Sequence, residues 1–393
     1  MLFSVDKLYM DICRVVILDR PMTALDDLEY IHSIDRSNML RVIETFPEQL
    51  LEALSIAEQS EIRKIDRRKI SNIVVAAVGG SAIQGDLIRN WIEDRMAIPF
   101  EVCRDSALPS YADRRTLVIA VSYSGDTQET LSQVLEAYEK RCRVFSVTSG
   151  GQLARISKKL GVPKVEVRRG LVPRAALPHL LISAAYVLWR SGLIKSLREE
   201  IKLASSQLSL MRREIRAENP LQSNRAKQFA IDLLGKYPVI YSSTRVSGVA
   251  RRIKNQFNEN SKVPSKFELL PEAVHNEIEG WKRLNMAEEE SMPFSIVFIR
   301  DTEESLSERI RFEEMKKLLN EAGISEFKQI LLEGETKLGR LLSGVYFGDL
   351  VSLYLAVARG FDPTPIKSIE KLKKRIDGRL RFKLSLEKRV RQL

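Results

Sequence analysis

The sequence predicts an α/β protein with two domains, each a parallel sheet flanked by helices. Short runs of β-branched residues alternate with amphipathic stretches, as expected when each strand of a parallel sheet is followed by a helix. These runs are apolar on both faces, which is typical of strands that helices cover on both sides. At roughly 150 residues per domain, the 393 residues are enough for two or three domains.

A helical lead-in is expected first, over residues 1–60. Asp35, Ser37 or Asn38 can cap one of its helices, because short polar side chains accept hydrogen bonds from the free amides of a first turn. Pro47 opens a further helix, since proline fits the first helical turn.

The sheets follow the lead-in. We expect a first domain over 61–197, a second over 198–361, and a C-terminal helix with a basic tail over 362–393. The strands are predicted within SNIVVAAVGG, PFEVCRD, TLVIAVSYSG and CRVFSVTSG in the first domain, and within KYPVIYSSTRVSG, PSKFELL, SIVFIRD and FKQILLE in the second. Each domain opens with a strand, a turn of small residues and a helix. This repetition favours a duplicated fold, and convergence on one supersecondary unit fits it as well.

The cysteine and histidine content excludes several classes of site. Cys13, Cys103 and Cys142 are too few and too widely spaced for a disulfide framework or a thiolate metal cage. The three histidines have none of the spacings of a zinc site. We therefore expect no metal and a reducing, cytoplasmic compartment.

No membrane attachment is expected. Charged residues interrupt residues 1–20 before any apolar run reaches the length of a signal-peptide core. The longest apolar stretch, Leu180–Trp189, is about half of the roughly 20 residues that a membrane span needs, which is typical of a buried helix.

The net charge of +11 is concentrated at the C-terminal end, where residues 371–393 contain ten Lys or Arg against two acids. Such a tail is usually a solvated helix face. No helix-turn-helix, zinc finger or RNA-binding motif accompanies it, so nucleic acid is not an expected partner.

Loops rich in glycine and hydroxyl groups follow three predicted strands. Glycine lets the backbone approach a ligand, and several hydroxyls in one turn exceed what a helix cap needs. Because the carboxyl ends of parallel strands share one edge, a phosphate is expected there. Its candidate ligands are Gly80 and Ser81 in the first loop and Ser122, Ser124 and Thr127 in the second, and the third loop is SVTSGG, residues 146–151.

These motifs resemble the sugar isomerase (SIS) domain proteins, and within them the bifunctional phosphoglucose/phosphomannose isomerases of archaea and some bacteria. Gln84 and Asp126 stand where this family usually has glycine and asparagine. The resemblance implies two SIS-type domains. Its motifs, in order, are ETFPEQLLEAL, VGGSAIQGD, LPSYADRRTLVIAVSYSGDTQET, VTSGG, LVPRAALP, LLPEAVHNEIEGW and FDPTPIKSIEKLK.

The resemblance also implies an aldose–ketose isomerase that needs no cofactor and interconverts fructose 6-phosphate with glucose 6-phosphate and mannose 6-phosphate through an enediol. Glu259 matches the family's base, and Arg174 matches the arginine that faces the enediolate. His275 and Lys371 match the groups that assist ring opening. Thr364 matches a small polar position that leaves room for both epimers.

Family members commonly form homodimers in which the histidine completes the partner's site, so His275 is expected at an interface between two copies. His32 and His179 match no motif and are expected to be structural. Two alternatives remain. One is an SIS enzyme for a different sugar phosphate. The other is a sugar-phosphate-sensing regulator, which should bind DNA in a salt-dependent way.

Overall fold

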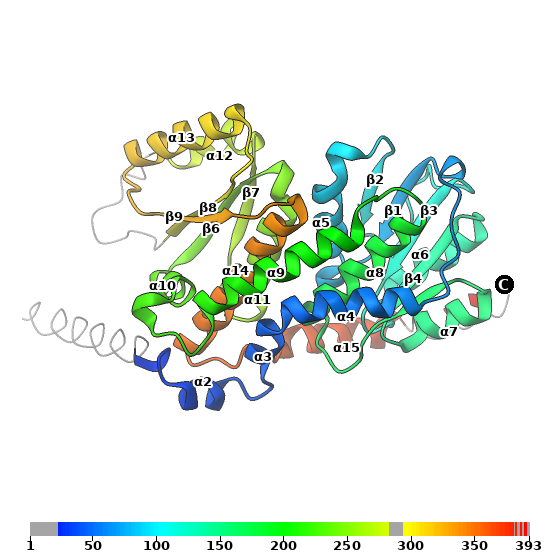
Figure 1. Cartoon of the computed structure of the whole chain (residues 1–393), viewed down its shortest axis with the longest axis horizontal. Coiled ribbons are helices and arrows are strands. Elements are labelled where there is room, and N and C mark those ends of the chain that lie inside the picture. Colours follow the sequence, from blue (N-terminus) through cyan, green and yellow to red (C-terminus); the bar gives the residue numbers. More distant parts are fainter. Residues whose placement is uncertain (1–22, 283–293, 381, 383–385, 387–388, 391–393) are drawn as a thin grey trace, which may run out of the picture. The chain divides into compact units, whose positions relative to one another are not determined.

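The chain divides into two compact units, each built from separate stretches of sequence (Figure 1). Unit 1 comprises residues 1–44, 207–333 and 342–365, and unit 2 comprises residues 45–206, 334–341 and 366–393. This computed structural model describes residues 23–282, 294–380, 382, 386 and 389–390. The predicted lack of a targeting segment in residues 1–20, and Cys13, lie outside the described residues.

Unit 2 contains a five-stranded parallel sheet in the order β2-β1-β3-β4-β5. The strands are β1 (Asn72–Ala76), β2 (Phe100–Cys103), β3 (Thr116–Val121), β4 (Arg143–Thr148) and β5 (Lys164–Glu166). Its helices are α4 (Phe46–Gln59), α5 (Ile83–Ile92), α6 (Gln128–Glu139), α7 (Gly151–Leu160), α8 (Leu177–Arg190) and α15 (Lys367–Leu380).

Apolar side chains cover both faces of this sheet. Val74 and Val118 point into one core, together with apolar residues of α6 and α7. Val75, on the opposite face, lies against α5. Leu386 of the basic C-terminal segment is buried in the α6–α7 core, so this part of the tail packs against the protein.

Unit 1 contains a four-stranded parallel sheet in the order β7-β6-β8-β9. The strands are β6 (Tyr237–Ser243), β7 (Lys266–Leu270), β8 (Phe294–Asp301) and β9 (Phe327–Leu332). Its helices are α2 (Leu28–Ile34), α3 (Met39–Glu44), α10 (Arg225–Asp232), α11 (Ser247–Glu259), α12 (Glu277–Gly280) and α13 (Leu306–Glu321). Two long helices, α9 (Leu197–Ile215) and α14 (Lys337–Ala358), contribute to both units.

Both sheets have the same topology. The first strand of each, β1 or β6, lies second in its sheet, the next strand forms the edge beside it, and the third lies on its other side. Strand β5 of unit 2 has no counterpart in the described part of unit 1. The α/β class, with parallel sheets flanked by helices, is confirmed, and the shared strand order is what a duplicated fold predicts. The three-residue strand β5 was not predicted from the sequence.

Two sequence predictions in the lead-in are confirmed. The Asp35 carboxylate accepts hydrogen bonds from the backbone N–H groups of Met39 and Leu40, at 2.8 and 2.7 Å, and so caps α3. Burial raises the pKa of Asp35. Pro47 lies in the first turn of α4.

The two most apolar helices are internal. The stretch at 180–189 lies in α8, and nearly all of it is buried, as predicted. The longer helix α14 has the length and hydropathy of a membrane span, but 94% of its apolar window is buried within the protein. Both are therefore core helices of α/β units.

A buried polar cluster joins α11 to α14 within unit 1. Arg252 donates to both carboxylate oxygens of Asp349, at 2.9 and 2.6 Å, and the two side chains are only 2% and 3% exposed. Asn260 donates to the Ser352 hydroxyl at 2.9 Å, and Ser261 donates to the Ser352 carbonyl at 2.6 Å. These bonds fix the C-terminal end of α11 against α14.

Replacing Asp349 with alanine leaves the Arg252 guanidinium buried without its counter-charge, so the free energy of unfolding should fall by about 3–5 kcal/mol. Urea unfolding followed by circular dichroism measures this loss. The matched control is Glu314→Ala, whose partner Lys317 is exposed, and its cost should stay below about 1 kcal/mol. Equal effects of the two changes would contradict a structural role for the buried pair.

Candidate active site

The three loops rich in hydroxyl groups meet at the carboxyl edge of the unit 2 sheet, because they follow the adjacent strands β1, β3 and β4. Residues Gly79–Ser81 form a 3-10 turn, and α5 begins only at Ile83. The Ser81 hydroxyl is buried and accepts a hydrogen bond from the Tyr123 N–H at 3.3 Å, so it connects the first loop to the second.

The second loop contains hydroxyls with two different roles. The Ser122 and Thr127 hydroxyls lie 2.8 Å apart, and Ser122 also accepts a hydrogen bond from the Gly125 N–H at 3.1 Å. Ser122 is fully buried, so its hydroxyl holds the turn in shape. Ser124 is exposed and Thr127 is partly exposed, so a ligand can reach these two residues. The Ser124 hydroxyl also accepts a hydrogen bond from the Asp126 N–H at 3.3 Å.

The hydroxyls of the third loop turn inward, contrary to the expectation of a third ligand-binding loop. Ser146 forms a hydrogen bond with Ser157 inside the core, at 2.8 Å. Ser149 donates to the Tyr123 carbonyl at 2.7 Å, and Thr148 donates to the Gly150 carbonyl at 2.9 Å. The third loop therefore supports the second rather than offering hydroxyls of its own.

The second and third loops touch backbone to backbone. A Cβ atom on Gly125 would lie 1.9 Å from the Gly150 carbonyl oxygen, and one on Gly151 would lie 2.3 Å from the Ser124 carbonyl oxygen. Gly125 and Gly151 also have positive φ angles of 73° and 67°. Only glycine satisfies both constraints.

The departure at Asp126 has a structural explanation. Its carboxylate accepts a hydrogen bond from the Gln152 N–H, at 3.1 Å, in the first turn of α7. Gly150 precedes this helix and has no side chain to cap it. Asp126 takes over the cap, where a negative charge also meets the positive end of the helix dipole.

Tyr123 is a positioning residue that the sequence analysis missed. Its hydroxyl donates to the Arg168 carbonyl at 3.0 Å and accepts from the Leu171 N–H at 2.8 Å. Burial raises the pKa of this hydroxyl, so it stays protonated at neutral pH. These bonds fix the segment that leads to Arg174, which is only 2% exposed. A Cβ atom on Gly80 would be 3.5 Å from the Arg174 backbone, so the first loop lies against this segment.

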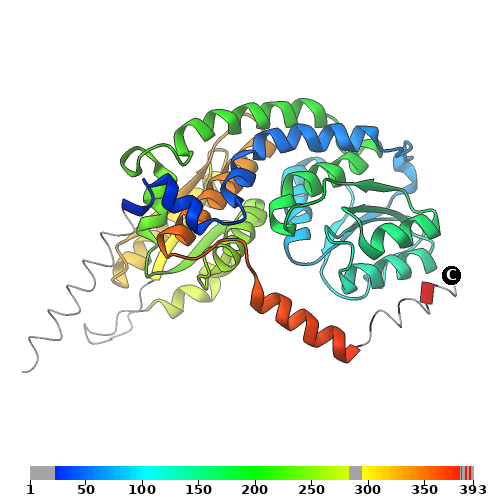
Figure 2. The same ribbon diagram turned by 90° about the horizontal axis from the view of Figure 1, so that it is seen from below.

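Lys371 is exposed on α15. Gln128, the residue after Thr127, donates a hydrogen bond to Asp377 on the same helix. This bond ties α15, the orange-red helix in Figure 2, to the start of α6 within unit 2.

In unit 1, the structure brings Glu259 and the Thr364 loop together through Lys262. Glu259 is the last residue of α11 and is partly buried. The Lys262 ammonium donates to the Glu259 carbonyl and to the carbonyls of Pro363 and Pro365, the latter two at 3.2 and 2.9 Å. Lys262 was not predicted as a site residue, because its role depends on carbonyls about 100 residues away in the chain.

His275 is exposed at the end of the turn that follows β7. The segment after it is fixed by Glu277, which accepts a hydrogen bond from Tyr241 and forms an ion pair with Lys266 at 3.0 Å. Trp281 donates to the Tyr241 hydroxyl at 2.8 Å. Burial, with Glu277 beside it, raises the pKa of Tyr241, so this hydroxyl remains a hydrogen-bond donor.

Comparison with known proteins identifies the family. A bifunctional phosphoglucose/phosphomannose isomerase of Caldicellulosiruptor bescii is 36% identical over 343 residues, which cover 86% of this chain and 98% of the relative. The enzyme of that name from Aquifex aeolicus is 34% identical over 324 residues, which cover 81% of this chain and 94% of the relative. This chain belongs to the bifunctional phosphoglucose/phosphomannose isomerase family. The family resemblance and the isomerase class predicted from the sequence are confirmed.

Further matches agree with this isomerase family. The model of the bacterial phospho-glucose isomerase C-terminal SIS domain matches residues 222–376. Among solved structures, a hypothetical protein from Thermus thermophilus has a TM-score of 0.66 at 15% identity and covers 95% of this chain and 97% of its own. The C-terminal domain of glucosamine-fructose-6-phosphate aminotransferase from Francisella tularensis has a TM-score of 0.59 at 16% identity. The match covers 83% of this chain and 99% of that domain. These structures support the SIS fold.

The site residues predicted from the sequence fall into two sets, each described within its own unit. Unit 2 holds Arg174 and Lys371 with the loop residues Gly80, Ser81, Ser122, Ser124 and Thr127, and unit 1 holds Glu259, His275 and Thr364. Among the residues that the structure describes, no group of three or more His, Cys, Asp or Glu side chains is placed to hold a metal ion. His32 is exposed on α2, whereas His179 is buried in α8, and burial lowers its pKa.

Gly125→Ala should disrupt the contact between the second and third loops of this isomerase. Backbone strain and the clash with Gly150 should together cost about 2–5 kcal/mol of unfolding free energy and most of the isomerase activity. Gly161→Ala is the matched control. Its φ of 66° is similar, but no atom lies within 4 Å of the added Cβ, so it should cost about 1–2 kcal/mol and leave activity unchanged. Urea unfolding and an isomerase assay compare them, and equal losses of activity would refute the loop contact.

Proposed function

We propose that this protein interconverts fructose 6-phosphate with glucose 6-phosphate and mannose 6-phosphate through an enediol intermediate. The main support is the partly buried Glu259 at the end of α11, joined through Lys262 to the Thr364 loop. Both segments lie within the region that matches the phospho-glucose isomerase domain. The names of the relatives support both aldose substrates.

Phosphate recognition is assigned to the carboxyl edge of the unit 2 sheet. Ser124 is exposed and Thr127 is partly exposed there, and the backbone contact at Gly125 holds them on a rigid turn. Such a turn offers hydroxyl and amide hydrogen-bond donors to an anion without a rearrangement of the loop.

Glu259 is assigned as the base. Its carboxylate removes the proton from C2 of the open aldose, and the C2–H electron pair forms the C1–C2 double bond of an enediolate while the carbonyl oxygen becomes negative. A proton passes from the C2 hydroxyl to the negative O1, and the carboxylic acid returns its proton to C1 as the C2 carbonyl forms, which gives the ketose and restores the carboxylate. Arg174 is assigned the role of a fixed cation that stabilises the enediolate oxygen.

The two aldose products differ only at C2. Rotation of the enediolate about its C2–C3 bond presents either face to the acid, and the small Thr364 side chain is assigned to leave room for both arrangements. His275 and Lys371 are assigned to ring opening, where a proton must reach the ring oxygen.

The active enzyme is proposed to be a homodimer in which His275 acts in the partner's site. His275 is exposed in the single chain, as a residue that serves a second copy should be. On α15, Ile369, Leu372 and Ile376 are 39%, 59% and 41% exposed and share one helix face. A second copy would cover this apolar stripe. The cytoplasm is the proposed location, since Cys103 and Cys142 are free thiols.

Incubation with fructose 6-phosphate in deuterated buffer tests the reaction. Proton NMR should show glucose 6-phosphate and mannose 6-phosphate, both deuterated at C2. Glu259→Gln should lower the rate about 10²–10⁴-fold, because an amide cannot accept the proton. Glu321→Gln is the matched control: it changes an exposed glutamate that likewise ends a unit 1 helix, and it should react normally.

Other outcomes of this experiment discriminate among the alternatives. If glucose 6-phosphate is the only aldose formed, the role assigned to Thr364, which is to leave room for both epimers, is wrong. Bound sugar phosphate without exchange, together with salt-dependent DNA binding, would favour the regulator. A relative from Sulfolobus acidocaldarius, 32% identical over 53% of this chain, is named D-glucosamine-6-phosphate 4-epimerase. Epimerisation of glucosamine 6-phosphate without isomerisation would favour that activity.

Complementation tests the shared site. Glu259→Gln and His275→Ala proteins should each be nearly inactive alone. Mixing them under conditions that exchange subunits should restore activity, because half of the sites in the heterodimer then combine an intact Glu259 with an intact His275. A mixture that stays inactive, although mass measurement shows heterodimers, would place both residues in a site within one chain.

A further inference from the structure

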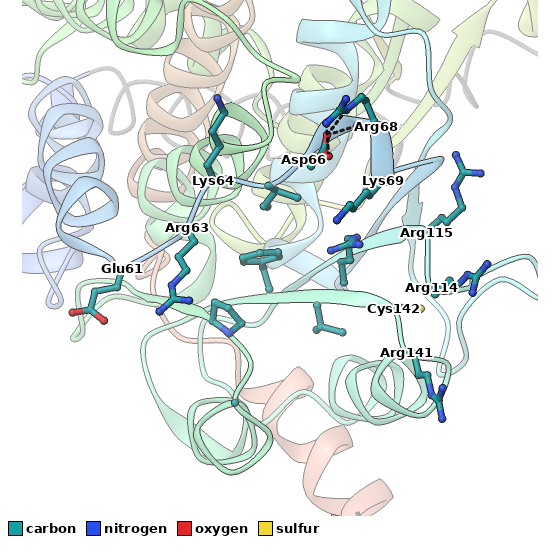
Figure 3. Close-up of a pocket in the computed structure, with 16 residues that line it drawn as sticks. Glu61, Arg63, Lys64, Asp66, Arg68, Lys69, Arg114, Arg115, Arg141 and Cys142 are labelled. Atoms are coloured by element: carbon teal, nitrogen blue, oxygen red, sulfur yellow. Dashed lines mark hydrogen bonds and ion pairs between the residues drawn. The ribbon is translucent and has the colours of Figure 1, made fainter.

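Unit 2 has a second concave surface, at the opposite edge of its sheet from the loops rich in hydroxyl groups (Figure 3). The strands are parallel, so their amino ends share one edge, and Arg115 and Arg143 lie at the starts of β3 and β4. Residues 61–69, which lead into β1, form another wall. The cavity has a volume of about 1020 Å³. None of the residues assigned to the isomerase reaction lines it.

This amino-edge pocket is strongly cationic. Its lining has only two carboxylates, those of Glu61 and Asp66. Against them stand eight basic side chains: Arg63, Lys64, Arg68, Lys69, Arg114, Arg115, Arg141 and Arg143. Half of the lining residues are therefore cations gathered from three separate segments of the chain, which Figure 3 shows around the cavity.

Most of this charge has no counter-charge in the protein. Arg68 forms an ion pair with Asp66 at 3.1 Å, drawn as a dashed line in Figure 3. The other seven cations make no ion pair within the described ranges of the chain. Elsewhere in unit 2, by contrast, cations such as Arg104 and Arg389 are paired with acids. The Nε of Arg143 is buried and has no hydrogen-bond partner among the described residues.

Arg141, one of the pocket cations, has an unusual backbone conformation. Arg141 has a φ of 57°, a conformation that is costly for an L-amino acid with a side chain. Glycine is the usual residue at this position after a helix. The chain instead places a guanidinium group on the wall of a pocket that is already positive. A ligand that carries several negative charges would relieve the repulsion among these cations.

The chemistry of the lining favours phosphate groups on a small molecule. Guanidinium groups bind phosphate oxygens through paired hydrogen bonds, and six of the eight cations are arginines. The volume matches that of small-molecule pockets, which reach about 1000 Å³. Phe145, which is largely buried, is the one aromatic residue in the lining, so an exposed platform for stacking nucleic-acid bases is missing from it.

We propose that the amino-edge pocket binds a small compound with two or more linked phosphate groups, at a site separate from the isomerase active site. Ligand binding in this pocket does not depend on the isomerase reaction.

Calorimetric titration of the full chain with tripolyphosphate, pyrophosphate and orthophosphate tests this site. Affinity should rise with the number of linked phosphates and fall as salt is added. The triple change Arg114→Ser, Arg115→Ser and Arg141→Ser should weaken tripolyphosphate binding at least tenfold. A matched control removes three exposed arginines from other surfaces, Arg36→Ser, Arg155→Ser and Arg213→Ser, and should bind as the unchanged protein does. Urea unfolding verifies that both variants are folded.

A further variant separates the two edges of the sheet. Ser124→Ala with Thr127→Ala alters the accessible hydroxyls of the other edge, and tripolyphosphate binding should persist in it. Loss of binding in this variant would assign the ligand to the carboxyl edge and overturn the proposal. So would equal affinity for orthophosphate and tripolyphosphate, or an unaffected triple variant. Tighter binding of a short single-stranded RNA through the same three arginines would replace the small ligand with a nucleic acid.

Discussion

The candidate site of unit 2 depends on a backbone contact that leaves no room for a side chain. Gly125 and Gly151 let the loops after β3 and β4 touch, and the surrounding hydrogen bonds depend on this approach. Asp126 reaches the first turn of α7 across the contact, and Ser149 reaches the carbonyl of Tyr123. Tyr123 in turn fixes the segment before Arg174. The loop geometry therefore follows from glycine placement more than from any one polar group.

In unit 1, a buried ion pair rather than a backbone contact holds the candidate site residues in position. The buried pair of Arg252 and Asp349 joins α11 to α14. The end of α11 is fixed by this pair and by the bonds to Ser352, and Lys262 then binds the carbonyls that flank Thr364. Glu259, the proposed base, needs a defined position relative to the substrate, and this cluster supplies it.

The unit 2 sheet has two edges of different chemistry. At the carboxyl edge, Ser124 and Thr127 present neutral hydroxyls on a rigid turn, and the buried Arg174 lies behind the first loop. At the amino edge, exposed cations such as Arg114 and Arg141 surround an open cavity. A parallel sheet makes this separation possible, since the starts and the ends of its strands lie on opposite edges.

The sequence by itself determined the fold class, nearly all the strands and the family, and it supplied the candidate site residues. β-Branched runs, glycine turns and family motifs are local signals that do not depend on distant contacts. Only the tertiary structure decided what each polar group does. The hydroxyls of Ser146 and Ser149 resemble ligand contacts in the sequence but bond inward, and Asp126 caps a helix. Lys262 and the amino-edge pocket went unnoticed, because their partners and neighbours come from distant parts of the chain. A hydrogen bond depends on distance and direction in space, which residue order alone does not specify.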